Sequence, residues 1–140
     1  MAQSFKSNHN SVYSCKYHVV FCPKYRRKVL TGEIAERLKV LVQELAAESE
    51  SEVLEIEVMP DHVHLLVDVP PHYGIAKFVR MCKGRSSRVL REEFPALKTR
   101  LPTLWTHSTF ISTVGGAPLS LVKQYIQNQQ RSEPRPKKNA

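Results

Sequence analysis

The 140-residue sequence has no apolar run near the roughly 20 residues that a membrane-spanning helix requires. Its N-terminal segment, MAQSFKSNHNSVYS, lacks the apolar block of a signal peptide. We therefore expect a cytoplasmic protein with no membrane partner. The three cysteines (Cys15, Cys22 and Cys82) are too few and too unevenly spaced for a disulfide framework or a cysteine-pair metal site.

Glycine is also scarce, with 5 residues, and none of them belongs to a glycine-rich phosphate loop. We therefore expect no nucleotide cofactor. Apolar residues make up 41% of the chain, which is typical of a globular protein. The length fits one domain with a single hydrophobic core.

Positive charge is what the sequence has in excess, with 21 Lys+Arg against 13 Asp+Glu and a formal net charge of +8. The charges are segregated along the chain. Residues 1–31 contain no acidic residue, residues 32–59 contain eight glutamates, and residues 77–100 contain eight basic residues. Any one of these runs could be a solvated face, but their separation favours a nucleic-acid partner. The candidate nucleic-acid contacts lie in a basic loop and on one helix: Lys24, Arg26, Arg27, Lys28, Arg80, Lys83, Arg85 and Arg88.

Hydrophobic periodicity predicts the element order β-α-β-β-α-β, followed by a last helix. The expected strands are 12–21, 53–59, 62–69 and 104–114, and the expected helices are 32–48, 75–91 and 119–130. In the second strand we expect Leu54, Ile56 and Val58 to face the core. The order is that of an α+β, ferredoxin-like (βαββαβ) antiparallel sheet with helices on one face. Its first and third strands are central, and its other face is open to a ligand.

The chain is expected to divide into three parts. Residues 1–11 form an N-terminal extension and residues 12–130 form the single domain. Residues 131–140 form a basic tail without apolar periodicity, which we expect to be disordered.

His62 and His64 carry the most specific chemical signal. On a strand, residues two apart point to the same face, so the two imidazoles would lie close enough to bind one divalent ion. Asp61 could orient one of the rings. The pair is equally compatible with two solvated polar residues. The other four histidines lack such spacing, and we expect structural roles for them: His9, His18, His72 and His107.

Tyr125 and Gln129 are four residues apart on the last predicted helix and therefore share one of its faces. Gln129 could supply a neutral oxygen ligand to a metal, and Tyr125 a phenolic nucleophile. A tyrosine that packs its ring on the sheet and a solvated amide are the alternatives.

Two motifs carry a family resemblance. PDHVHLL, which follows a glutamate-rich strand, and QYIQNQ near the C-terminus resemble the single-strand DNA transposases of the HUH class. These are small tyrosine transposases of bacterial and archaeal insertion sequences. YHVVFCPKYRRKVL, FVRMCKGRSSRVLREEFP and LWTHSTFISTVGG are similar to the same family's pattern, so the resemblance extends from about Tyr13 to Gln130.

The resemblance implies a ferredoxin-like fold with a C-terminal helix that carries the catalytic tyrosine. It implies that His62, His64 and Gln129 bind Mg²⁺ or Mn²⁺ and that Tyr125 is the nucleophile. The implied reaction is the cleavage and rejoining of single-stranded DNA through a 5′-phosphotyrosine intermediate, without ATP, after recognition of hairpin ends. The implied assembly is a homodimer with composite active sites.

Two other functions fit parts of the sequence. A non-catalytic ferredoxin-like module that binds RNA or DNA could use Tyr13, Tyr17 and Phe21 as a base-stacking surface. A metal-dependent hydrolase would use the histidines while Tyr125 has only a structural role.

Overall fold

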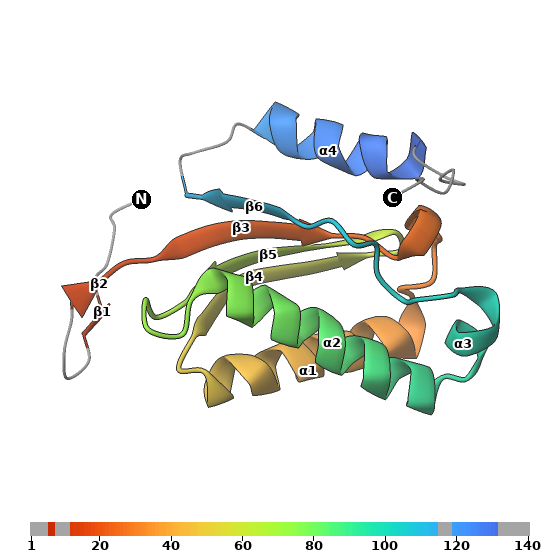
Figure 1. Ribbon diagram of the computed structural model, residues 1–140, viewed down its shortest axis with the longest axis horizontal. Coiled ribbons are helices and arrows are strands. Elements are labelled where there is room, and N and C mark those ends of the chain that lie inside the picture. Colours follow the sequence, from red (N-terminus) through yellow and green to blue (C-terminus); the bar gives the residue numbers. More distant parts are fainter. Residues whose placement is uncertain (1–5, 8–11, 115–118, 132–140) are drawn as a thin grey trace, which may run out of the picture.

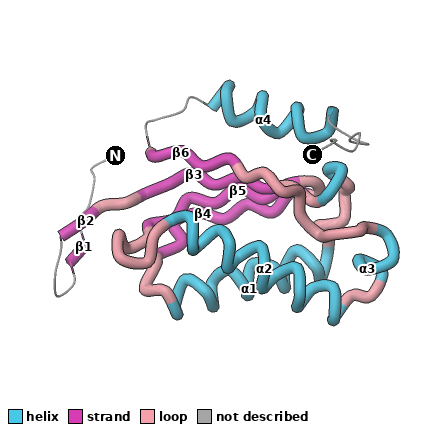
Figure 2. Tube along the Cα trace, viewed as in Figure 1, coloured by secondary structure: helices cyan, strands magenta, loops and turns pink. Residues whose placement is uncertain are grey.

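A computed structural model of the chain describes residues 6–7, 12–114 and 119–131. Its centre is a four-stranded antiparallel sheet with the strand order β4-β5-β3-β6 (Figures 1 and 2). The four strands are β3 (Lys16–Phe21), β4 (Glu52–Met59), β5 (His62–Asp68) and β6 (Phe110–Thr113). The first and third of these in chain order, β3 and β5, are central, which confirms the ferredoxin-like α+β plan.

Helices lie on both sides of this sheet. Helices α1 (Gly32–Glu48) and α2 (Ile75–Glu93) cover one face, and α4 (Leu119–Arg131) lies on the side away from them (Figure 1). Two short helices, η1 (Lys24–Arg26) and α3 (Ala96–Arg100), occupy connections. Among the described residues, none of the helices is long and apolar enough to cross a membrane.

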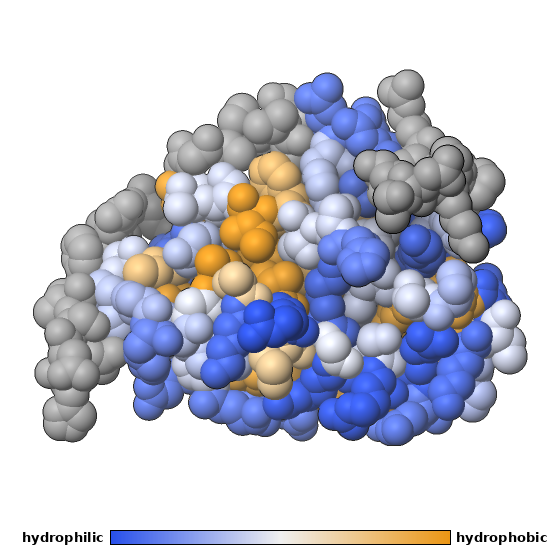
Figure 3. Space-filling view, viewed as in Figure 1, coloured by the Kyte–Doolittle hydropathy of each residue, from blue (hydrophilic) through white to orange (hydrophobic). Residues whose placement is uncertain are grey.

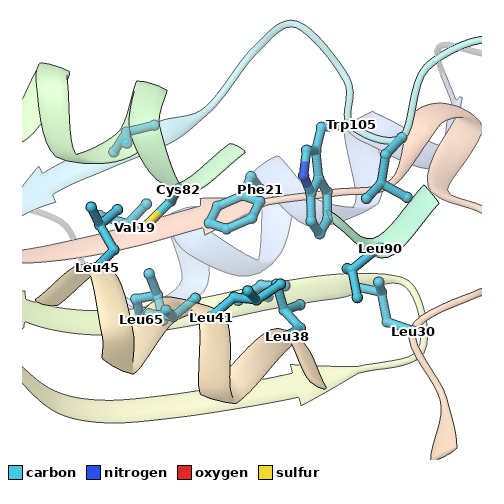
Figure 4. Close-up of a cluster of buried hydrophobic side chains, with 14 of the residues drawn as sticks. Val19, Phe21, Leu30, Leu38, Leu41, Leu45, Leu65, Cys82, Leu90 and Trp105 are labelled. Carbon is cyan, nitrogen blue, oxygen red and sulfur yellow. The ribbon is translucent and has the colours of Figure 1, made fainter. Parts of the chain in front are cut away.

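The core fills the space between the sheet and the two covering helices (Figure 4). Apolar residues of α1 recur every three or four positions, so one side of that helix is buried: Leu38, Leu41, Val42 and Leu45. From β3, Val19 and Phe21 face these helices. The Phe21 ring meets Trp105 edge-on, with ring centroids 4.7 Å apart.

A buried serine on α2 accepts the hydrogen bond of the Trp105 indole N–H. Trp105 Nε1 donates to Ser86 Oγ at 2.9 Å, and that hydroxyl donates to the Cys82 carbonyl at 2.6 Å. Replacing Ser86 by alanine leaves the indole N–H buried without an acceptor. We expect the free energy of unfolding to fall by about 1–3 kcal/mol, measured by urea denaturation. Ser87→Ala on the same helix should change it by less than about 0.5 kcal/mol, and equal effects would contradict this account.

Two expected strands are shorter in the structure. The first is interrupted at Ser14 and Cys15, so Val12–Tyr13 forms a separate strand, β2, which pairs with β1 (Lys6–Ser7). The last strand begins only at Phe110. In the preceding segment, the Lys83 ammonium donates hydrogen bonds to main-chain carbonyls that a strand would use for pairing. Trp105 makes only an isolated bridge with Pro23 there.

The expected apolar face of β4 was wrong at one position. A register shift lies between Val53 and Glu55, so the alternation of side chains changes phase at Leu54. As a result Val53, Ile56 and Val58 pack against the core. The expected disordered tail lies outside the described residues, apart from Arg131 at the end of α4.

Candidate active site

The face of the sheet opposite α1 and α2 carries both the histidine pair and a residue in contact with α4. In β5, Val63 and Leu65 are fully buried toward the helices, so His62 and His64 point to the other face. Val20 of β3 lies opposite His64 on one side and opposite Phe110 of β6 on the other. Cross-strand partners share a face, so Phe110 and His64 point the same way.

The imidazole of His62 is held by a carboxylate. Its Nδ1 lies 2.8 Å from Asp61 Oδ1, which is the expected orienting contact. Arg26 Nε donates to the other oxygen, Asp61 Oδ2, at 2.7 Å. Burial alone would raise the pKa of Asp61, but the hydrogen bond from His62 and the charge of Arg26 lower it below its ordinary value. The carboxylate is therefore ionised at neutral pH, and it directs the Nδ1 proton of His62 inward and the lone pair of Nε2 outward.

His64 lies against a third histidine, His18 of β3. His18 Nδ1 and His64 Nε2 are 3.2 Å apart, and the two rings are stacked with centroids 5.3 Å apart. Burial, followed by the charge of His18, lowers the pKa of His64, while Glu57, 3.7 Å from His64 Nδ1, opposes the shift. His64 is therefore neutral at pH 7, as a metal ligand must be. The spacing of the histidines along the sequence did not indicate this contact of His18 with the pair.

Tyr125 and Gln129 meet at one hydroxyl. Ser108 Oγ lies 3.1 Å from the Tyr125 hydroxyl and donates to Gln129 Oε1 at 3.2 Å. The Tyr125 ring packs on Phe110 with centroids 5.4 Å apart. Burial raises the pKa of Tyr125, and the hydrogen bond with Ser108 partly offsets this. The phenol is therefore protonated at neutral pH. Ser108 could not be identified from the sequence, because a serine in a loop has no periodicity to mark it.

Arg26 links α4 to the histidine site. Its Nη1 donates to the carbonyl of Ile126 on α4 at 3.0 Å, while its Nε holds Asp61. The backbone of Tyr25 and Arg26 is left-handed, with φ of 60° and 52°, which is uncommon for residues other than glycine. This conformation turns η1 toward α4. Arg26, expected as a DNA contact, thus has Asp61 and Ile126 among its partners within the protein.

Two more of the expected DNA contacts have intramolecular partners. Lys83 Nζ donates to the carbonyls of Thr106, His107 and Ser108 at 2.7, 3.3 and 3.2 Å. It thereby fixes the loop that presents Ser108. Arg85 forms two hydrogen bonds of 2.8 Å with the carboxylate of Glu48. The remaining candidates are exposed or half-buried: Lys24, Arg27, Lys28, Arg80 and Arg88.

The donor set fits a divalent cation. His62 offers an oriented nitrogen, His64 is neutral, and Gln129 carries a neutral oxygen on the helix that lies over the same face. Within the described ranges, no three His, Cys, Asp or Glu side chains form a metal-binding group. Gln129 as the third ligand, which we expect from the sequence, stays a prediction.

Comparisons with known proteins show the family to which the chain is similar. Residues 11–129 match the family model described as "Transposase IS200 like". The ISDra2 transposase TnpA of Deinococcus radiodurans is 40% identical over 130 residues, which cover 91% of this chain and 93% of that protein. The transposase for insertion sequence element IS200 of Salmonella typhimurium is 33% identical over 126 residues, covering 89% of this chain and 82% of that one.

Solved structures show the same fold. A crystal structure of a Deinococcus radiodurans transposase superposes with a TM-score of 0.80 at 38% identity, covering 89% of this chain and 97% of the other. A REP-associated tyrosine transposase bound to a REP hairpin gives 0.53 at 14% identity, covering 86% and 68%, and supports the fold alone. The family model and the relatives together define a tyrosine transposase of insertion sequences. The chain belongs to the IS200-like transposase family.

Proposed function

We propose that this transposase cleaves and rejoins single-stranded DNA at the ends of an insertion sequence, with residues 12–130 as the catalytic unit. One observation carries the proposal. The ring of Tyr125 packs on Phe110 of β6. Phe110 lies on the same face of the sheet as His64 of β5, because Val20 of the intervening strand β3 pairs with both residues. A nucleophile and a histidine pair on one face of the sheet suit a phosphodiester laid between them.

In the proposed reaction, the Tyr125 hydroxyl attacks the scissile phosphorus. The phenol loses its proton, an oxygen–phosphorus bond to Tyr125 forms, and the bond to the 3′ oxygen of the departing strand breaks. That strand leaves with a 3′-hydroxyl, and the 5′ phosphate stays on Tyr125. A 3′-hydroxyl then attacks the phosphotyrosine and restores the phenol. One phosphodiester is exchanged for another, so no nucleotide cofactor is consumed.

His62, His64 and Gln129 would hold Mg²⁺ or Mn²⁺. When bound, the cation offsets the negative charge on the nonbridging phosphate oxygens and orients the phosphate. Asp61 keeps the His62 ring in the ligating tautomer, through the 2.8 Å contact with Nδ1. Ser108 holds the Tyr125 hydroxyl and the Gln129 amide beside each other before DNA arrives.

Hairpin ends are the proposed recognition elements. The REP-associated transposase of related fold is bound to a REP hairpin. The proposed backbone contacts in this chain are the basic residues of the η1 loop and of α2 that are exposed or half-buried: Lys24, Arg27, Lys28, Arg80 and Arg88. Each phosphate that they neutralise would make binding more sensitive to salt.

We further propose a homodimer with composite active sites. β6 is an edge strand, and Ile111 and Val114 are 39% and 42% exposed. Figure 3 shows hydrophobic residues gathered where β6 passes above α2, with hydrophilic residues around them. An edge with apolar side chains favours pairing with a second sheet. The partners of α4, Arg26 and Ser108, exist in every copy, so a partner's α4 would find the same contacts there.

Trapping the covalent intermediate tests the reaction. Single-stranded oligonucleotides from the sequence flanking the gene are labelled at the 3′ or the 5′ end and incubated with Mn²⁺. We expect a denaturation-resistant adduct that carries the 3′ label, while the 5′ label leaves on a free fragment. Tyr125→Phe should form no adduct, because the ring keeps its packing on Phe110 but has no hydroxyl.

The outcomes separate the alternatives. An adduct that persists in Tyr125→Phe would show that the nucleophile is misassigned. An adduct that carries the 5′ label would show that the protein is joined to the 3′ side of the cleaved bond instead of the 5′ phosphate. Cleavage without an adduct in either protein would indicate a hydrolase. The base-stacking surface expected for a binding module does not form, because Tyr13 and Phe21 are buried and Tyr17 packs against the core.

A further inference from the structure

Lys83 of α2 binds four oxygens of one short segment. Its ammonium donates to the carbonyls of residues 106–108 and to the Thr109 hydroxyl, at distances from 2.7 to 3.3 Å. An ammonium has three protons and no acceptor. Its hydrogen-bonding capacity is therefore used within the protein, and none remains for a DNA phosphate.

The ammonium of Lys83 is half-buried and has no acidic partner. Burial lowers the pKa of Lys83 to about 8, although Cys22 opposes the shift, so the group is still protonated at pH 7. Among the described residues, no Asp or Glu forms an ion pair with it. A charged group in such a place is costly unless other groups replace the water that it has lost. The oxygens of residues 106–109 do so, and their arrangement in turn depends on the ammonium.

The same segment positions the residues that contact Tyr125. Ser108 belongs to it, and Ser108 Oγ lies 3.1 Å from the Tyr125 hydroxyl and donates to Gln129 Oε1. Phe110, whose ring packs on that of Tyr125, follows the segment directly and begins β6. The polar and the apolar contact of the tyrosine therefore both depend on the path of residues 106–109.

This segment connects two helices that lie on opposite sides of the sheet. Helix α2 covers one face together with α1, and α4 lies on the other side (Figure 1). Lys83 donates to the Ser108 carbonyl at 3.2 Å, and the Ser108 side chain bonds to both polar groups of α4. A displacement of about 1 Å in a reacting group can cost about a hundredfold in rate. Loss of the ammonium would therefore slow the attack by the nucleophile.

We infer that Lys83 is a positioning residue for the strand-transfer reaction. Its ammonium fixes residues 106–109, and Ser108 and Phe110 then place the Tyr125 hydroxyl and the Gln129 amide. The inference deepens the proposed function and rests on it. It gives Lys83 a role within the protein, in place of the DNA contact that its position among basic residues suggested.

Lys83→Met tests the inference, because methionine keeps much of the length of the side chain and lacks the charge. At saturating DNA, the rate of Tyr125-dependent adduct formation should fall by about 10–100-fold. Affinity for a fluorescent hairpin from the palindrome flanking the gene should stay the same. The slope of log affinity against log salt should also stay the same, since no phosphate contact is lost. Lys98→Met, which changes an exposed lysine on α3, is the matched control and should alter none of these values.

A small amine provides a readout that a role in packing alone would not change. Lys83→Ala removes a fragment equal in size to propylammonium. A groove of about 700 Å³, which Lys83 lines, gives the amine access to the four oxygens. Propylammonium should raise the adduct rate of Lys83→Ala by about tenfold, the value of a hydrogen bond to a charged group. Tetramethylammonium, a cation without an N–H, should leave the rate unchanged.

A double-variant cycle shows whether Lys83 acts through Ser108. Ser108→Ala should lower the adduct rate by itself, because the Tyr125 hydroxyl loses its partner. A variant with both Lys83→Met and Ser108→Ala should be about as slow as the slower single variant, since both changes remove the same placement. Losses that multiply would show that Lys83 acts by another route and would overturn the inference.

The remaining outcomes separate the inference from the proposed function. A normal adduct rate in Lys83→Met would remove the inference and leave the proposed function intact. If the salt slope were also lower by about 0.9, Lys83 would be a DNA contact. Weaker hairpin binding, with a lost rate that propylammonium does not restore, would assign Lys83 to the stability of the fold. Absence of the adduct from the original protein would remove the proposed function itself.

Discussion

Alanine at His62 or at His64 is expected to abolish DNA cleavage without changing the affinity for hairpin DNA. The imidazoles lie on the face of the sheet turned away from α1 and α2, whereas the proposed backbone contacts are exposed basic residues of the η1 loop and of α2. Removal of the imidazoles should therefore not affect hairpin binding. Loss of a cation that offsets phosphate charge removes several kcal/mol of transition-state stabilisation, which is about a thousandfold in rate. The rate of fragment release from a 5′-labelled strand, measured with Mn²⁺, gives the loss.

His72→Ala is the matched control. This exposed histidine precedes α2, and the variant should cleave at the original rate.

Mixing His64→Ala with Tyr125→Phe adds a test of the proposed assembly. If subunits exchange α4, half of the dimers are mixed and each has one complete site, so about a quarter of the adduct should return. Reduced hairpin binding in the histidine variants would instead indicate that the pair has a structural role.

Arg26→Lys is expected to raise the Mn²⁺ concentration needed for cleavage by about 10–100-fold. The guanidinium bonds Asp61 and the Ile126 carbonyl with two different nitrogens, and a lysine ammonium lacks that planar fork. Without it, the carboxylate that orients His62 is less well fixed. Hairpin affinity should stay the same, because the charge is kept and the residue points into the protein.

Cleavage rates over a titration of Mn²⁺ measure this effect, and saturating metal should restore most of the rate. Arg27→Lys, its exposed neighbour, should leave the metal dependence unaltered. Weaker hairpin binding with normal metal dependence in Arg26→Lys would contradict this account. Arg26 would then be a DNA contact, as its position in a basic loop suggested.

The elements of the fold follow from local patterns, and so they could be predicted. Helix α1 begins and ends where its periodicity predicts, and the central positions of β3 and β5 follow from the element order. The errors arose where a distant residue decides the local structure. Residues 104–109 resemble a strand, but Lys83, about 20 positions earlier, binds their carbonyls. The bulge at Leu54 likewise depends on pairing with β5.

The candidate site shows the same division. The spacing of His62 and His64, and of Tyr125 and Gln129, is local and places each pair on one face. His18 joins the histidines only through the register of β3 on β5, in which Val20 lies opposite His64. No spacing along the chain expresses that register. Arg26 and Lys83 look like surface charges in the sequence, because their partners lie far away in the chain.

The order of the elements along the chain has a consequence for gene decay. Both histidines and the basic residues of the η1 loop and of α2 precede residue 94, whereas Tyr125 lies on α4, the last described element. Under the proposed mechanism, a stop codon between β6 and α4 would leave a protein that retains the hairpin-binding residues but lacks the nucleophile. Such a product would occupy the ends of intact copies of the element and silence them. Mutational damage late in the gene would thus convert the mobile element into a source of its own repressor.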